Sequence, residues 1–230
     1  MNNMSISMGK RQLVDSIWKS AGIEGLGTTF PNTEKILANI PVQTKRDEVL
    51  FIVNLKRAWY FLFDNIDYPN NISYLRELNK ICMVDLSYDA GNIRTAPVTI
   101  GGTSWVPEIP QERIIIEKLD EIAAMDNKLE AALEMFCFIA RTQMFLDGNK
   151  RVAQLMCNKI MMENDIGIFS VPYDDIDEFK KLLVEFYETN DSHEIKDFFR
   201  KKCLLLNPEY VQKVKNVSET MPVNNIHHHR

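Results

Sequence analysis

The chain contains very little histidine. Only four of its 230 residues are histidines, and three of them form the run His227–His229 near the C-terminal end. This run indicates either a natural metal-binding end or a tag left from cloning, and we favour the tag. His193 follows Asp191 and Ser192, where a helix is expected to begin, so we expect a surface side chain in a first helical turn. The sequence therefore argues against a Ser-His-Asp triad and against a histidine-rich zinc site.

Closely spaced cysteine pairs and long apolar runs are also missing. No C-x-x-C pair occurs, and the spacing favours reduced thiols in a core. The four cysteines are Cys82, Cys137, Cys157 and Cys203. No apolar run approaches the roughly 18 residues that a membrane-spanning helix needs, and the N-terminal segment lacks the apolar core of a signal peptide. We therefore expect a cytoplasmic protein with no membrane partner.

Positive charge is not concentrated in any part of the sequence. The formal net charge is −5, and no cluster of lysine and arginine stands out. Binding to nucleic acid of any sequence is therefore not expected. Hydrophobic residues make up 45% and charged residues 26%, as in soluble globular proteins. The length allows one substantial domain with an appended segment.

Helical periodicity dominates the pattern of apolar residues. Apolar side chains recur at three- and four-residue spacing, which is typical of helices packed on a core. The helices expected from this spacing cover residues 10–21, 32–38, 45–65, 72–83, 112–124, 127–145, 150–164, 175–189 and 192–205.

One segment has a different texture. The stretch GNIRTAPVTIGGTSWVPEIP, residues 91–110, places β-branched and small residues around Gly101 and Gly102 and contains several prolines. This composition predicts a β-hairpin. There is no internal repeat or low-complexity tract. The sequence thus predicts an all-α domain with one β-hairpin.

The stretch QMFLDGNKR, residues 143–151, has the composition of a phosphate-binding loop. Gly148 permits backbone angles that let consecutive N–H groups converge on an anion. The helix that follows adds its positive N-terminal end, and Lys150 and Arg151 add charge. Asp147 is a carboxylate of the kind that binds Mg²⁺ beside phosphate. An ordinary helix-loop-helix turn also uses Asp-Gly-Asn, so both interpretations stay open at this level.

These residues resemble the signature of the Fic family (filamentation induced by cyclic AMP), HxFx[DE]GN[GK]RxxR, except that Gln143 stands where the signature has histidine. The stretch AGNIRTAPVTIGG, residues 90–102, is similar to the family's flap motif. The resemblance covers residues 45–205 and implies the Fic fold, a helical bundle with one β-hairpin flap. It divides the chain into an N-terminal inhibitory helix segment (1–43), a Fic domain (44–206) and a loose C-terminal tail (207–230).

A second, shorter pattern precedes this region. SAGIEG, residues 20–25, indicates on its own only a helix that ends at glycine. Ahead of a Fic-like domain it resembles the family's inhibitory motif, [ST]xxxE[GN]. The resemblance implies that Ser20, Glu24 and Gly25 form this motif. Glu24 would then enter the nucleotide site and block the place of the γ-phosphate.

The resemblance also implies a reaction. Most Fic proteins transfer AMP from ATP to a Ser, Thr or Tyr hydroxyl of a target protein, and the motif histidine takes the hydroxyl proton. By position, Asp147 would hold Mg²⁺, Gly148 and Asn149 would cradle phosphates, and Lys150 and Arg151 would neutralise their charge. Phe145 is interpreted as an apolar anchor of the loop.

Three departures from the signature qualify this reaction. Gln143 can orient a hydroxyl but cannot take up its proton, which predicts slow transfer with nucleotide binding retained. Gln154 replaces the last arginine of the signature, so Glu24 should rely on Gln154, Arg151 or Lys150 instead. Lys150 itself resembles the Doc branch of the family, whose members transfer the γ-phosphate.

Further positions are assigned through the resemblance alone. Phe179 falls near the family's base-stacking tyrosines and would either stack on adenine or lie in a helix core; Tyr187 and Asn190 receive no role. The flap, residues 94–106, is expected to dock the target protein. The leading prediction is AMP transfer, with an inactive nucleotide- or partner-binding module and Doc-like phosphotransfer as alternatives. A homo-oligomer is left open.

Overall fold

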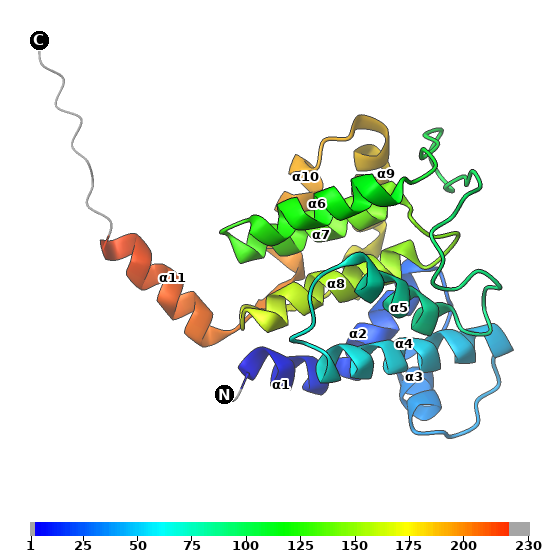
Figure 1. Ribbon diagram of the computed structural model, residues 1–230. Coiled ribbons are helices and arrows are strands. Elements are labelled where there is room, and N and C mark those ends of the chain that lie inside the picture. Colours follow the sequence, from blue (N-terminus) through cyan, green and yellow to red (C-terminus); the bar gives the residue numbers. More distant parts are fainter. Residues whose placement is uncertain (1–2, 221–230) are drawn as a thin grey trace, which may run out of the picture.

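The computed structural model describes residues 3–220, and its elements are mainly helices (Figure 1). None of the helices in this part of the chain combines the length and hydropathy that crossing a membrane requires. The histidine run lies outside the described residues. The helices are α1 (Met4–Arg11), α2 (Leu13–Ile23), α3 (Phe30–Leu37), α4 (Arg46–Asp64), α5 (Ile72–Met83), α6 (Glu112–Ala124), α7 (Lys128–Thr142), α8 (Asn149–Glu163), α9 (Ile176–Thr189), α10 (His193–Phe198) and α11 (Pro208–Thr220).

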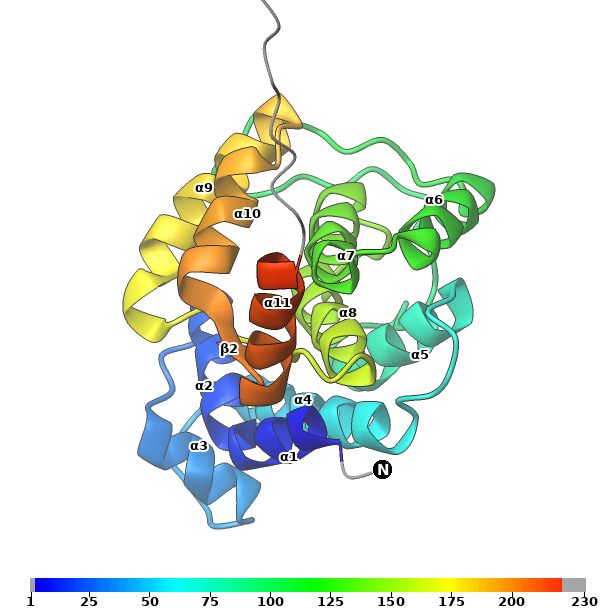
Figure 2. The same ribbon diagram turned by 90° about the vertical axis from the view of Figure 1, so that its left-hand side faces the viewer.

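Helix α8 lies at the centre of the molecule (Figure 2). It packs against α7, α5, α4 and α1, and almost all of its residues are buried. Two of its buried polar side chains pair with backbone groups outside the helix, as polar groups in an apolar interior usually do. Asn158 exchanges two hydrogen bonds of 2.9 Å with the backbone of Phe169, and Lys159 donates to the carbonyl of Ile66 at 2.9 Å. These bonds fix the rotation of α8 about its own axis.

Helix α2 is held closely against the main body. Trp18 stacks on Tyr173, with ring centroids 4.1 Å apart and planes within 6°. Tyr173 belongs to the short 3₁₀ helix η1 (Tyr173–Asp175), which leads into α9. A Cβ atom on Gly22 would lie 2.8 Å from side-chain atoms of Tyr173 and Ile176. Glycine therefore allows the close approach of α2 to η1 and α9 without displacing these two side chains.

The all-α class is confirmed, but the predicted β-hairpin is wrong. Residues 93–110 form an irregular excursion with a turn at Gly101–Gly102, and no strand is assigned within them. The described strands, β1 (Gly167–Phe169) and β2 (Leu204–Leu206), lie elsewhere and pair antiparallel. Prolines lack the backbone N–H group that pairing between two strands requires. The Arg94 guanidinium donates hydrogen bonds to backbone carbonyls at both ends of the excursion, those of Ala96 and Glu108. Cross-strand pairing is thereby replaced. From here on, the name flap refers to residues 93–110, a slightly longer stretch than the residues 94–106 of the sequence prediction.

The C-terminal region also differs from the sequence prediction. The helix expected over 192–205 ends at Phe198 and continues as a π-helical turn, η2 (Phe199–Cys203), and then as β2. Residues predicted to be loose form α11, which projects from the body (Figure 1). The side chain of Asn207 accepts a hydrogen bond from Glu209 N at 3.0 Å, and proline follows at the first helical position, a regular helix start. His193 begins α10 and is exposed, as expected.

Candidate functional site

Hydrogen bonds from the buried side chain of Asn149 hold the loop between α7 and α8 in place. Its amide donates to the carbonyl of Phe145 at 2.8 Å and to Gln143 Oε1 at 3.0 Å, and its Oδ1 accepts from Phe145 N at 3.0 Å. Asn149 is buried, and the Phe145 side chain is 1% exposed. Phe145 is therefore the apolar anchor that the sequence predicted, and Asn149 ties it to the start of α8.

Gly148 allows the loop to turn into α8. Its φ angle is +83°, in the left-handed region, which side chains with a Cβ adopt at an energetic cost. An added Cβ would also lie 2.9 Å from Asn79 Nδ2 and 3.0 Å from Met83 Sδ. Asn79 donates to the carbonyl of Asp147 at 2.8 Å and accepts from Gly91 N at 2.9 Å. The loop is thus joined to α5 and to the chain just before the flap.

The Asp147 carboxylate is directed outward, and its side chain is 62% exposed. Its Oδ1 accepts from Gly148 N at 2.5 Å and from Arg151 Nη2 at 3.0 Å. Within residues 3–216, its Oδ2 has no hydrogen-bond partner. One carboxylate oxygen therefore remains available at the N-terminal end of α8.

Glu24 reaches this helix end from α2. Its Oε2 lies 3.2 Å from Lys150 Nζ, and its Oε1 lies 4.0 Å from Arg151 Nε. The chain carries Glu24 there because α2 ends in a Schellman turn, with Gly25 at φ +77° and Leu26 N donating to Ala21 O at 3.0 Å. The cationic start of α8 thus already has one carboxylate beside it.

Gln154 does not bond to Glu24. Its amide donates to Ser20 Oγ at 3.3 Å and to the carbonyl of Lys150 at 3.2 Å. Of the partners that the sequence left open for Glu24, Lys150 is the nearest in the structure, and Gln154 instead connects α8 to the first residue of the SAGIEG motif.

Both polar atoms of the Gln143 side chain have hydrogen-bond partners. It donates to the carbonyl of Ala140 at 2.6 Å and to the hydroxyl of Tyr187 at 3.4 Å, and it accepts from Asn149. Burial, and then the negative charge of Glu24, hold the pKa of Tyr187 above its ordinary value. The hydroxyl is therefore protonated at neutral pH, and neither side chain can take up a proton there.

These groups line one cavity of about 180 Å³. Gln143, Asp147, Asn149, Lys150 and Glu24 contribute to its walls, so most of the predicted site residues lie together. Arg151 is 5% exposed and lies behind them, with its guanidinium 4.9 Å from the Phe51 ring. The rest of the lining comes from Leu146 and Tyr187 and from the flap, through Thr99, Ile100 and Gly101.

The structure corrects the role predicted for Phe179. Its side chain is 0% exposed, and its ring packs among Phe136, Phe198 and Phe199 at centroid distances of 6.1 to 6.4 Å. The prediction that it stacks on adenine is wrong, because the apolar interior between α7 and α10 covers the ring. The aromatic side chain that does line the cavity is Tyr187, about two helical turns further along α9, which sequence reasoning left without a role.

Arg94 is a structural residue of the site that sequence reasoning missed. It is 1% exposed and donates to the carbonyls of Gln143 at 2.6 Å, Ala96 at 2.8 Å and Glu108 at 2.5 Å. Burial lowers its pKa. It closes the base of the flap and joins that base to the loop. The arginine within the flap motif, G-x-x-R, was the available signal.

The tip of the flap touches α9. Glu188 accepts a hydrogen bond from the Thr103 hydroxyl at 2.9 Å, and Trp105 stacks on Tyr187 with centroids 5.6 Å apart. The Arg141 guanidinium lies 4.4 Å from the Trp105 ring. The flap is thus attached at its base and at its tip, while the main chain of residues 97–101 makes no hydrogen bond with any described residue.

Comparison with known proteins agrees with this geometry. The sequence model of the Fic/DOC family matches residues 69–161, which include α5, the flap, α7 and the loop. This part of the chain therefore matches the Fic/DOC family in sequence. No curated protein matches the chain in sequence.

Solved structures with the same fold come from several organisms. Fic-1 (aa134–508) from C. elegans aligns with TM-score 0.74 and 18% identity, covering 96% of this chain and 68% of that one. A Fic domain containing signaling protein from Bacteroides thetaiotaomicron VPI-5482 aligns with TM-score 0.69 and 17% identity over 77% and 72%. A Fic family protein from Desulfovibrio desulfuricans G20 gives TM-score 0.68 and 15% identity over 93% and 67%. At these identities the likeness establishes the Fic fold.

The residues present fit a nucleotide with a divalent cation. The free oxygen of Asp147 is a hard donor suited to Mg²⁺, which proteins usually bind through one or two carboxylates together with phosphate oxygens and water. The first N–H groups of α8 and the side chains of Lys150 and Arg151 suit phosphate. In the described part of the chain no group of three or more His, Cys, Asp or Glu side chains could hold a metal. A metal here would need the phosphates as further ligands.

Proposed function

We propose that this chain is a Fic-type protein adenylyltransferase that transfers AMP from ATP to a Ser, Thr or Tyr hydroxyl of a target protein. The position of Glu24 carries the proposal. Its carboxylate lies 3.2 Å from Lys150 Nζ, at the cationic end of α8, where a phosphate would also bind. The cavity of about 180 Å³ is smaller than the roughly 300–1,000 Å³ of typical small-molecule sites. Glu24 would therefore keep the enzyme inactive until α2 moves.

Each residue around the cavity would have its own role in AMP transfer. Asp147 would hold Mg²⁺, which would neutralise charge developing on the phosphates. The first N–H groups of α8, with Lys150 and Arg151, would position the nucleotide. Gln143 would orient the attacking hydroxyl through its Oε1 atom without accepting the proton. Since a positioned general base contributes about 10²–10⁴-fold, while positioning and charge stabilisation contribute separately, transfer would be slow.

The flap would present the target. The main chain of Thr99–Gly101 lines the cavity and is free of hydrogen bonds to the described residues, so an extended target segment could pair with it as an added strand. Val98→Pro should reduce modification of the target and leave nucleotide affinity unchanged. An equal loss of both would assign the flap a purely structural role.

A catalytically inactive nucleotide- or partner-binding module is the second candidate. It is favoured by the engagement of Gln143 with Ala140, Tyr187 and Asn149, which leaves its amide no free donor for catalysis. Doc-like phosphotransfer is the third candidate, and it rests on the lysine at position 150.

Labelled ATP separates the three candidates. Purified protein, with Glu24 intact or replaced by Gln, is incubated with α-labelled or γ-labelled ATP and Mg²⁺. AMP transfer predicts label from the α position only, stronger in Glu24→Gln because the Lys150 partner is neutralised. Glu117→Gln, on the exposed surface of α6, is the matched control and should not change labelling. Label from the γ position only would establish phosphotransfer, and no label despite measured ATP binding would establish the binding module.

A further inference from the structure

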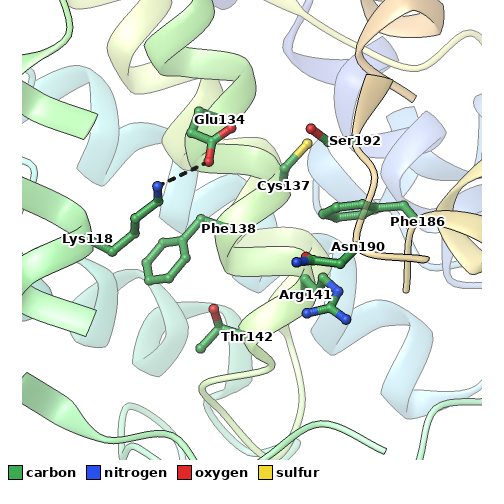
Figure 3. Close-up of a pocket in the computed structure, with 9 residues that line it drawn as sticks. All are labelled: Lys118, Glu134, Cys137, Phe138, Arg141, Thr142, Phe186, Asn190 and Ser192. Atoms are coloured by element: carbon green, nitrogen blue, oxygen red, sulfur yellow. Dashed lines mark ion pairs between the residues drawn. The ribbon is translucent and has the colours of Figure 1, made fainter. Parts of the chain in front are cut away.

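A second and larger cavity, of about 350 Å³, lies between α6, α7 and the turn that follows α9 (Figure 3). It shares no lining residue with the nucleotide site. Its volume falls in the range of about 300–1,000 Å³ that is typical of small-molecule sites. The composition of its walls indicates what kind of molecule it would hold.

One wall carries a charge-balanced network. Glu134 contacts Lys118 at 3.5 Å and Lys196 at 2.5 Å, and Lys118 also contacts Glu121 at 3.2 Å; Figure 3 shows the Lys118–Glu134 pair. Burial alone would raise the pKa of Glu134, but the hydrogen bonds and charges of Lys196 and Lys118 bring it below its ordinary value. Two carboxylates and two ammonium groups thus neutralise one another.

Arg141 is left as a cation with no carboxylate partner among residues 3–216. Its Nη2 donates to the carbonyl of Tyr187 at 3.2 Å, and its Nε is buried without an acceptor. Burial lowers its pKa, but a guanidinium stays protonated at neutral pH. The lining of the cavity therefore has an excess of one positive charge.

The rest of the lining is amphipathic. Thr142, Asn190 and Ser192 face the cavity, and none of their side chains has a hydrogen-bond partner in the described part of the chain. Phe138 and Phe186 provide apolar surface beside them. Figure 3 shows these side chains around the same space. Cys137 also lines it, but burial raises the pKa of its thiol to about 12, so it is not a nucleophile.

We propose that this cavity binds a small organic anion, a carboxylate or a phosphate monoester attached to an apolar body, with Arg141 as its anchor. The planar fork of a guanidinium matches both anions. The apolar body packs on Phe138 and Phe186, and the hydroxyl and amide groups complete the hydrogen bonds. Because Arg141 also contacts Trp105, the occupied cavity adjoins the attachment of the flap.

Calorimetry on the full chain tests this site with three matched probes: 3-phenylpropionate, phenyl phosphate and the neutral 3-phenylpropanol. We expect at least one anion to bind with a dissociation constant of about 1 mM or tighter, and the alcohol not to bind. Arg141→Gln should weaken binding at least about tenfold, through loss of the charged hydrogen bonds. Arg113→Gln, an exposed arginine of α6, should have no effect. Whichever anion binds identifies the head group.

A second variant makes the test independent of the stability of Arg141→Gln. Ser192→Tyr fills the cavity without removing a charge and should also abolish binding. Lys150→Gln should leave it intact, since Lys150 belongs to the other cavity. The proposal is overturned if neither anion binds below about 10 mM, or if the neutral alcohol binds equally well. It is also overturned if Lys150→Gln alone removes binding, which would place the anion at the start of α8 and leave the proposed transferase function unaffected.

Discussion

The α7–α8 loop and the flap line the same cavity, but they are held in place in different ways. The loop rests on buried groups: Asn149 and Phe145 are almost fully covered, and the chain around Gly148 packs against α5. The flap is attached by hydrogen bonds of Arg94 at the base and by contacts of Trp105 and Thr103 at the tip, and its side chains Ile93 and Ile100 are only partly buried against the core.

The difference separates two properties of a binding site. Hydrogen bonds within a buried region open only together with their surroundings, whereas an exposed segment with few bonds opens locally and at low free energy. The loop side of the cavity is therefore preformed, and the flap side can rearrange. Residue 143 lies on the preformed side, so its chemistry can change while the geometry is retained. The following predictions test whether the loop is more firmly held than the flap.

The largest effect is expected from Gln143→His. If the frame around residue 143 is preformed, restoring a proton acceptor should raise AMP transfer by about 10²–10⁴-fold, and more in combination with Glu24→Gly. Self-labelling with α-labelled ATP is measured for the wild type, both single variants and the double variant. Gln212→His, on exposed α11, serves as the control. A silent double variant that still binds ATP would show that Lys150 and Gln154 have reshaped the site as well.

Arg94→Ala should have the next largest effect, because it leaves buried carbonyls of both the flap and the loop without a donor. We expect the free energy of unfolding to fall by about 3 kcal/mol, measured by denaturant titration. Arg113→Ala, whose side chain is 72% exposed, should change it by less than about 0.5 kcal/mol. Equal changes would mean that Arg94 contributes no more than a surface arginine.

Gly148→Ala should destabilise the protein by about 2 kcal/mol, since the left-handed backbone and the close contact with Asn79 both oppose a Cβ. The same substitution at Gly101, in the flap, is the matched comparison, because no heavy atom lies within 4 Å of the Cβ position there. Thermal unfolding of the two variants compares the two regions directly. A destabilised Gly101→Ala would contradict the view that the flap is loosely packed.

The smallest effect is expected from Glu188→Gln. Glu188 lies on α9 and accepts a hydrogen bond from Thr103 at the tip of the flap. The bond from Thr103 is exposed, so its loss should change local stability by a few tenths of a kcal/mol. Hydrogen exchange in a peptide covering the flap should become slightly faster, while exchange in α8 stays the same. Glu185→Gln, also on α9, is the control. If α8 responded as well, the two sides of the cavity would not be independent.

Most of the fold was predictable because it depends on local periodicity. The apolar spacing of α4, α5, α6 and α7 predicts each helix to within a few residues of its observed ends. Strands β1 and β2 were missed because three apolar residues carry no period, and each forms only against a partner far along the chain. The start of α11 does carry a signal, Asn207-Pro208-Glu209, which its polar composition obscured.

The site was predictable where a motif fixes a backbone. Gly148 and Asn149 perform local tasks, a turn and a bridge to Phe145, so their positions follow from the sequence. Arg94 was missed, and Phe179 was left open between adenine stacking and a helix core, because burial is a property of the assembled fold. A guanidinium in a polar segment is expected to be exposed, yet here four carbonyls surround it. A phenylalanine on an amphipathic helix fits a core and a ligand pocket equally well.

Helix α8 adds a consequence for how such a protein changes during evolution. Asn158 and Lys159 lock its rotation deep in the interior, roughly three turns from the loop. Substitutions at the mouth of the site therefore cannot propagate into a twist of the helix that carries Asn149, Lys150 and Arg151. A lineage can exchange one residue at position 143 for another without first acquiring compensating changes in the core. Under the proposed function, loss and recovery of the reaction would be single-step events, while loss of the scaffold would require several.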